Sequence, residues 1–253
     1  MSTNTYPIES PALMNPSPDT SHHRMARLAG VLYLVIIVAG IFAQMFVRSS
    51  LIVPGDASAT AQNIIASEGL LRLSIAGDLV MIMSDIAIGL IFYVLLKPVN
   101  NTLALLATFF RLAQATALGI NLLNLFLGIK LLGGAGFMGA FSQAQLNALA
   151  LTFFEAHATG YTLSMVFFGL SILILGYLVF KSGYLPKVLG GMLVVAACGY
   201  LTDSFAQVLM VNYADYASIF SLVVFMPAFI AELAFGLWLL VKGVKTRPAT
   251  QAV

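Results

Sequence analysis

The chain has 253 residues, of which 60% are hydrophobic and only 9% are charged, with a formal net charge of +2. Soluble domains carry about 25% charged residues, so this composition excludes an ordinary water-soluble globular protein. The small net charge also gives no reason to expect a nucleic-acid partner.

Residues 1–25 are rich in Pro, Ser, Thr and Asn, and we expect them to form a disordered cytoplasmic tail. Six apolar runs follow, each close to the ~20 residues that a membrane-spanning helix needs. They lie at 28–47, 73–96, 103–129, 153–180, 187–210 and 218–241. These runs do not alternate as the strands of a membrane β-barrel would. The sequence predicts an all-α membrane protein, with six transmembrane helices over residues 26–243 and a tail over 244–253.

The connection over 48–72 is long and is predicted to lie on the outer side of the membrane. Pro54 and Gly55 predict a turn there, and either Asp56 or Ser58 then caps a short helix. Long outer connections are where loops most often carry function.

The connection over 131–157 is also long and begins with a glycine-rich turn. Ser142 and Gln145 have the S-x-x-Q spacing of a capping box, which predicts the start of a helix. This helix either lies in the membrane interface or continues into the 153–180 run.

The basic residues are distributed unevenly between the two sets of connections. Eight lie in the N-terminal tail, the 97–102 turn, the 181–187 turn and the C-terminal segment. Three, Arg48, Arg72 and Lys130, lie in the opposite loops, and Arg111 lies inside a run. The positive-inside rule then places both termini in the cytoplasm, and we expect a multi-pass protein of the cell (inner) membrane.

The run LALLATFFRLAQATALGINLLNLFLGI (103–129) carries Arg111 well inside the membrane. A charge near the bilayer centre costs ~2.5–3.5 kcal/mol on insertion scales, so it is expected to face protein and find a partner. Counted from the turn that joins the second and third helices, Arg111 lies ~13 Å deep and Asp85 ~16 Å. We therefore predict an ion pair between Arg111 and Asp85, with Glu232 as the competing partner. The pair is either a structural clamp or part of a functional site.

A second group of polar residues is predicted nearer the outer surface. Asp78 and Asp85 are seven residues apart and share one helical face, and other helices carry similar polar stripes. These stripes are predicted to converge on an outward-facing cavity lined by Gln44, Asp78, Asn121, Asn124, Glu155, His157 and Asp203. The other interpretation is that they form hydrogen bonds between helices, worth about 0.6 kcal/mol each.

Motifs for known chemistry are absent from the sequence. It contains no Walker A loop and no G-x-S-x-G motif. Of the three histidines, only His157 lies at a predicted membrane helix, which argues against a multi-histidine zinc site or a bis-histidine haem site. We therefore expect no metal and no cofactor.

Three segments in combination resemble a known family. They are ARLAGVLYLVIIVAGIFAQMFVRSSLIVPGDASATAQNI, FYVLLKPVNNTLALLATFFRLAQA and SGYLPKVLGGMLVVAACGYL. The chain is similar over about residues 26–243 to the bacterial and archaeal membrane family called domain of unknown function 4386. The resemblance implies a six-helix integral membrane protein. It implies no established activity and assigns no catalytic residues.

The sequence leaves three functions open. The first is binding or moving a small solute, a proton or a lipid through the outward-facing cavity. The second is a non-catalytic scaffold, sensor or assembly subunit. The third is a membrane enzyme with Asp78, His157 and Asp203 as an acid–base set, which the missing metal-ligand cluster disfavours. The bilayer is the expected partner, and the oligomeric state stays open.

Overall fold

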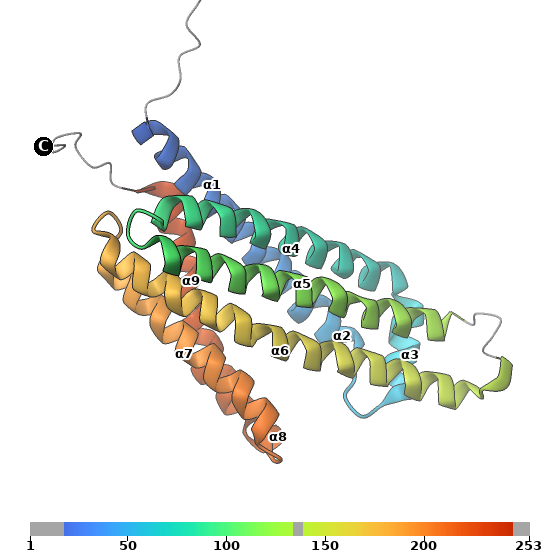
Figure 1. Cartoon of the computed structure of the whole chain (residues 1–253). Coiled ribbons are helices and arrows are strands. Elements are labelled where there is room, and N and C mark those ends of the chain that lie inside the picture. Colours follow the sequence, from blue (N-terminus) through green and yellow to red (C-terminus); the bar gives the residue numbers. More distant parts are fainter. Residues whose placement is uncertain (1–17, 134–138, 245–253) are drawn as a thin grey trace, which may run out of the picture.

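The protein folds into a bundle of long helices. The computed structural model describes residues 18–133 and 139–244, and this part of the chain contains no strand (Figure 1). Six helical segments are long and apolar enough to cross a membrane: Ser21–Leu51, Glu68–Leu96, Asn101–Leu132, Gln143–Ser182, Lys187–Leu209 and Tyr213–Val241. The predicted all-α class and the six spans are confirmed.

Two of the six spans are not plain α-helices. The first consists of α1 (Pro18–Ile41), the π-helix η1 (Phe42–Arg48) and α2 (Ser49–Leu51). The last consists of α8 (Tyr213–Phe220), the π-helix η3 (Ser221–Phe225) and α9 (Met226–Val241). The four between them are α4 (Glu68–Leu96), α5 (Asn101–Leu132), α6 (Gln143–Ser182) and α7 (Lys187–Leu209). A short helix, α3 (Ala57–Ala66), joins the first two spans.

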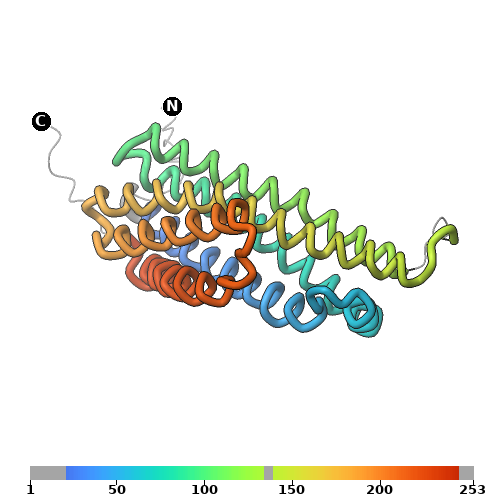
Figure 2. Tube along the Cα trace, turned by 90° about the horizontal axis from the view of Figure 1, so that it is seen from below, coloured from blue at the N-terminus to red at the C-terminus, as the bar shows by residue number. Residues whose placement is uncertain are grey.

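The six spans form a closed ring. Each packs on the next in the chain, and α9 packs back on α1. The start of α1, the end of α9 and the turns α4–α5 and α6–α7 lie at one end of the bundle, which we call the terminal end (Figures 1 and 2). The opposite end, with α3 and the start of α6, is called the loop end. There α7 and α8 splay away from the layer of α4, α5 and α6 (Figure 1).

The start of α1 and the end of α9 lie at the same end of the bundle because the number of spans is even. This arrangement is the same whichever side of the membrane that end faces. The cytoplasmic location of the termini therefore stays a prediction from the charge distribution.

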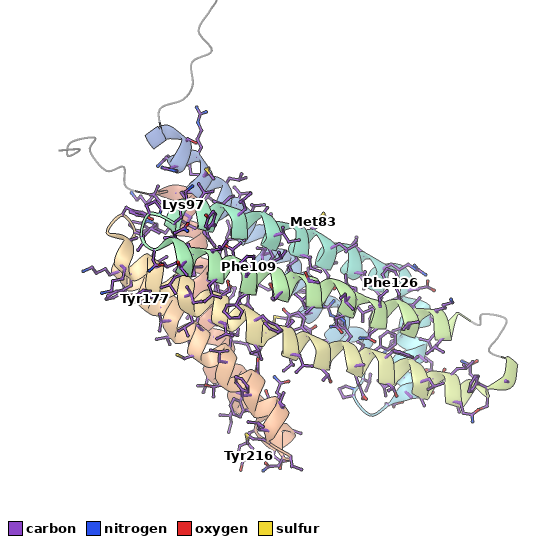
Figure 3. The ribbon with its side chains drawn as sticks, viewed as in Figure 1. Met83, Lys97, Phe109, Phe126, Tyr177 and Tyr216 are labelled. Atoms are coloured by element: carbon purple, nitrogen blue, oxygen red, sulfur yellow. The ribbon has the colours of Figure 1, made fainter. Side chains whose placement is uncertain are left out.

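Large apolar side chains cover the outside of the bundle. Met83 and Phe109 point away from it (Figure 3), with exposed fractions of 61% and 57%. Such a surface would be unfavourable in water and suits the hydrocarbon core of a bilayer. The protein is therefore a multi-pass membrane protein.

The first helix begins earlier than predicted. The prediction of a disordered tail over residues 1–25 is wrong for residues 18–25, which belong to α1. In these extra turns the His23 ring lies 3.5 Å from the carbonyl oxygen of Val244, just after α9, and one turn further on Arg27 donates to Val241 at the end of α9. Residues 1–17 and 245–253, which hold the rest of the predicted tails, lie outside the described residues.

Both predicted helix starts in the long connections are confirmed. The Asp56 side chain accepts a hydrogen bond of 2.9 Å from the Ala59 backbone and caps α3, after a turn in which Gly55 has φ 76°. Ser142 and Gln145 form a reciprocal capping box. The helix that they start is continuous to Ser182, so it is the beginning of α6 rather than a separate interfacial helix.

The terminal half of the bundle is held by close helix contacts at glycine. Gly190 in α7 lies against the backbone of α6, where an added Cβ would be 2.6 Å from the Phe180 nitrogen. Small residues allow this approach, which is how membrane helices gain packing energy.

Gly190→Ala is expected to lower the melting temperature in detergent, because overpacking costs about 1–3 kcal/mol. Gly191→Ala is the matched control. A Cβ there would meet no atom within 4 Å, and alanine favours a helix over glycine by about 1 kcal/mol. Thermal unfolding followed by circular dichroism measures both. Equal melting temperatures for the two variants would contradict the close approach.

Candidate functional site

The middle of the bundle contains a buried ion pair between α4 and α5. Arg111 donates to Asp85 Oδ1 from Nε at 3.0 Å and from Nη2 at 2.7 Å. Gln114 donates to the other carboxylate oxygen at 3.3 Å. Arg111 is 2% exposed and Asp85 is 1% exposed. The short turn between the two helices brings these residues to the same depth, which is the contact that the depth argument predicts.

Aromatic rings surround the Arg111 guanidinium. Its central carbon lies 5.2 Å from the ring centre of Phe168, 5.8 Å from Tyr33 and 5.9 Å from Phe92. Such rings attract a cation through their negative faces and shield it from lipid. Arg111 Nη1 is buried and has no hydrogen-bond partner among the described residues.

Glu232 occupies a separate position close to this pair. Tyr200 donates to Glu232 Oε1 at 2.5 Å, and Tyr33 donates to Oε2 at 3.2 Å. Glu232 is therefore held by hydroxyl groups from α7 and α1 rather than by Arg111. We call Arg111, Asp85, Gln114, Glu232, Tyr33 and Tyr200 the central cluster.

A second buried ion pair lies nearer the loop end. Arg48 donates to the Asp78 carboxylate from Nη1 at 2.5 Å and from Nη2 at 3.3 Å, and its Nε donates to Gln44 at 2.8 Å. The prediction that Arg48 belongs to an outer loop is wrong, because it is 3% exposed. The π-helix η1 carries the first span past the apolar run and turns Arg48 toward α4. π-Helical turns are frequent at functional positions.

Asn121 and His157 join α5 to α6. Asn121 donates to the His157 backbone oxygen at 2.8 Å, and His157 Nδ1 lies 3.3 Å from the Asn121 backbone oxygen. Asn124 donates to the Asn121 side chain at 2.9 Å. His157 Nε2 is buried without a partner among the described residues.

Asp203 forms another contact, at the splayed helices. Its carboxylate accepts hydrogen bonds from Tyr213 at 2.6 Å and from Gln207 at 2.8 Å. Gln207 in turn accepts from Thr162 on α6 at 2.8 Å. Asp203 is buried, and this network joins α6, α7 and α8.

The residues predicted to line one outward-facing cavity are thus divided among three contacts. Asp78 and Gln44 bind Arg48, Asn121 and Asn124 meet His157, and Asp203 binds Tyr213. Glu155 is exposed on the surface of α6. No hydrogen bond joins Asp78, His157 and Asp203 to one another in the described part of the chain. Asp203 instead forms a network with Tyr213 on α8 and, through Gln207, with Thr162 on α6.

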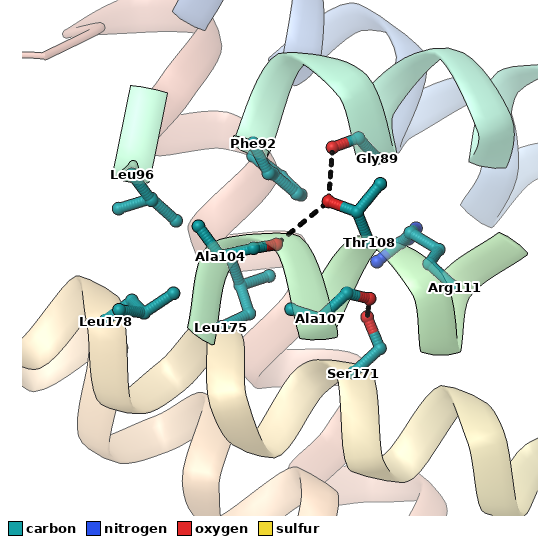
Figure 4. A pocket seen from close by; sticks show the side chains of 10 residues that line it. All are labelled: Gly89, Phe92, Leu96, Ala104, Ala107, Thr108, Arg111, Ser171, Leu175 and Leu178. Carbon is teal, nitrogen blue, oxygen red and sulfur yellow. Dashed lines mark hydrogen bonds between the residues drawn. The ribbon is translucent and has the colours of Figure 1, made fainter. Parts of the chain in front are cut away.

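A small cavity adjoins the central cluster (Figure 4). It runs from Arg111 toward Leu96 and Leu178 at the terminal end, and its volume is about 10 Å³. That is close to the least volume that holds one water molecule. The hydroxyl groups that line the cavity donate to backbone carbonyl oxygens. Thr108 donates to Gly89 and Ala104, and Ser171 donates to Ala107.

Comparisons with known proteins found one matching family model and a relative. The model of the family described as "Domain of unknown function (DUF4386)" matches residues 28–243. A protein of Archaeoglobus fulgidus described as uncharacterized is 30% identical over 173 residues, which is 68% of this chain and 85% of that protein. No solved structure matches.

Proposed function

The chain belongs to the family described as domain of unknown function (DUF4386), and we propose that this member binds protons at buried carboxylates and moves them across the membrane. The observation that carries the proposal is the charge balance inside the bundle. The alternatives are tested by the same experiment.

The described part of the bundle buries more carboxylates than guanidinium groups: Asp78, Asp85, Asp203 and Glu232 against Arg48 and Arg111. Each guanidinium pairs with one aspartate. Asp203 and Glu232 accept hydrogen bonds from hydroxyl or amide groups, and neither contacts a cation among the described residues. An ionised carboxylate without a cation is costly in a membrane interior, so such a group takes up a proton or a cation.

The two unpaired carboxylates lie along one route. Tyr200, Asp203 and Gln207 are three and four residues apart and share a face of α7. Asp203 is near the loop end, and Tyr200 donates to Glu232 at the centre. From there Tyr33 and Arg111 lead to the small cavity, which extends toward the terminal end.

The size of the central cavity favours a proton over an organic solute. At about 10 Å³ it has room for roughly one water molecule. Pockets that bind drug-sized molecules usually measure about 300–1,000 Å³. A proton needs only the carboxylate and a water.

Proton flux into liposomes tests the proposal. Wild-type protein should acidify liposomes that contain a pH-sensitive dye faster than empty liposomes do, under an imposed membrane potential. Glu232→Gln should abolish most of this flux, because glutamine is uncharged and cannot exchange a proton. Asp203→Asn should reduce it too, and infrared spectra should lose the carboxylic-acid carbonyl band of Glu232 in the first variant.

Glu155→Gln is the matched control, since it makes the same chemical change at an exposed carboxylate. It should leave the flux unchanged. Each variant is first checked for a wild-type elution profile in detergent. Wild-type flux equal to that of empty liposomes, or full flux in Glu232→Gln, would refute proton movement.

A membrane scaffold is the second candidate. It is favoured by the way in which the polar contacts join helices that are neighbours in the ring: Arg111–Asp85 joins α4 to α5, and Asn121–His157 joins α5 to α6. If proton flux is absent while the polar variants are destabilised, these residues serve to hold the helices together.

A further inference from the structure

A groove opens at the loop end of the bundle, between the start of α4 and the end of α5. It is lined by Glu68, Arg72, Phe126, Ile129, Lys130 and Gly133, and its volume is about 360 Å³. None of these residues belongs to the central cluster or to the three contacts nearer the loop end. The groove therefore needs an explanation of its own.

Two of the three cations at the loop end line this groove. The sequence places Arg48, Arg72 and Lys130 at that end of the bundle. Arg48 is buried against Asp78, whereas Arg72 and Lys130 both line the groove. Glu68 accepts a hydrogen bond of 2.7 Å from Arg72 Nε. The two Nη groups of Arg72 make no hydrogen bond in the described part of the chain, so they can donate to a ligand. The groove thus carries two cations against one carboxylate.

The groove lies at the ends of two membrane-spanning helices. Glu68 is in the first turn of α4, and Lys130 is in the last turn of α5. The ends of membrane-spanning helices lie in the interfacial region, where lipid phosphates are found. Phe126 is one turn deeper on α5 and is 43% exposed (Figure 3). The charged residues thus lie at the helix ends and Phe126 lies deeper, which matches the order of the polar headgroup and the apolar chains in a phospholipid.

We propose that this groove binds the phosphodiester headgroup of a membrane phospholipid. Arg72 and Lys130 hold the phosphate oxygens, because guanidinium and ammonium groups form strong charge-assisted hydrogen bonds to phosphate. Phe126 and the neighbouring apolar surface of α5 contact the first part of the acyl chains. The excess of cations selects an anionic lipid over a zwitterionic one, since the latter carries a balancing ammonium group.

Native mass spectrometry and thermal unfolding with added lipid test the site. Phosphatidylglycerol should bind the purified full-length protein and raise its melting temperature. The double variant Arg72→Gln/Lys130→Gln should bind this lipid about tenfold more weakly or worse, because it loses both charged contacts. Arg72 and Lys130 are both exposed, so the variant without lipid should melt close to the wild type.

The control for charge is Lys97→Gln/Lys187→Gln, which removes two exposed cations at the terminal end. This variant should bind phosphatidylglycerol as the wild type does. Equal lipid affinity in the Arg72/Lys130 variant, or an equal loss in the control, would overturn the site. Inorganic phosphate alone should give no comparable shift of the melting temperature. If it does, the groove binds free anions and the lipid assignment is wrong.

Discussion

Arg111→Gln alone, or Asp85→Asn alone, is expected to lower the free energy of unfolding in detergent by about 3–5 kcal/mol. Either change leaves a charge in the centre of the bundle without its partner. The guanidinium and the carboxylate are 2% and 1% exposed, so water cannot take over the missing contact. The double variant should recover much of the loss, because both charges disappear together.

The exposed pair Arg72–Glu68 provides the control for this cycle. Its N···O distance is also 2.7 Å, but its side chains are 54% and 43% exposed. Exposed pairs contribute about 0–1 kcal/mol, so Arg72→Gln and Glu68→Gln should change stability little. Additive losses in the Arg111/Asp85 double variant would contradict the buried-pair explanation. If the recovered double variant conducts protons as the wild type does, the pair is a clamp. If it folds without conducting them, the pair belongs to the functional site.

Arg48→Gln is also expected to lower the free energy of unfolding by about 3–5 kcal/mol, because it leaves Asp78 buried without a cation. Gln44→Ala should cost about 1 kcal/mol, since it removes one hydrogen bond to Arg48. Arg24→Gln, at an exposed arginine of the same span, should leave the free energy of unfolding within about 0.5 kcal/mol of the wild-type value.

The melting temperatures of these variants in one detergent measure the differences. Asp78→Asn added to Arg48→Gln should restore part of the stability. An Arg48→Gln variant that melts with the wild type would show that Arg48 behaves as the surface residue that the sequence predicts.

The number of spans could be predicted because it depends only on local composition. An apolar run of about twenty residues has no other stable location, whatever its neighbours are. The helix ends depend on more than composition. Residues 18–25 are mostly polar, and their helix lies beside the segment that follows α9, where His23 is 3.5 Å from the Val244 carbonyl oxygen. The sequence contains no comparable local sign of the π-helices η1 and η3.

In the candidate site too, contacts set by the local sequence could be predicted, and contacts set by helix packing could not. The contact of Arg111 with Asp85 could be predicted, because a short turn fixes both the neighbouring helix and the depth. Arg48 follows an apolar run, so its position alone indicates a loop residue. Its burial depends on η1 and on the packing of the first span against α4. The separation of Asp203 from Asp78 depends on the angle at which α7 leaves α6, and polar stripes on single helices contain no information about that angle.

The closed ring sets an order in which the centre can be assembled during synthesis. Asp85 and Arg111 are separated by only 26 positions along the chain, so they can meet as soon as the second helical hairpin has entered the bilayer. Tyr33 and Glu232 are separated by 199 positions. The Tyr33 hydroxyl therefore has no Glu232 acceptor until the last helix has left the translocation machinery. Glu232 is the last buried charged residue along the described part of the chain, and its docking between Tyr33 and Tyr200 closes the ring.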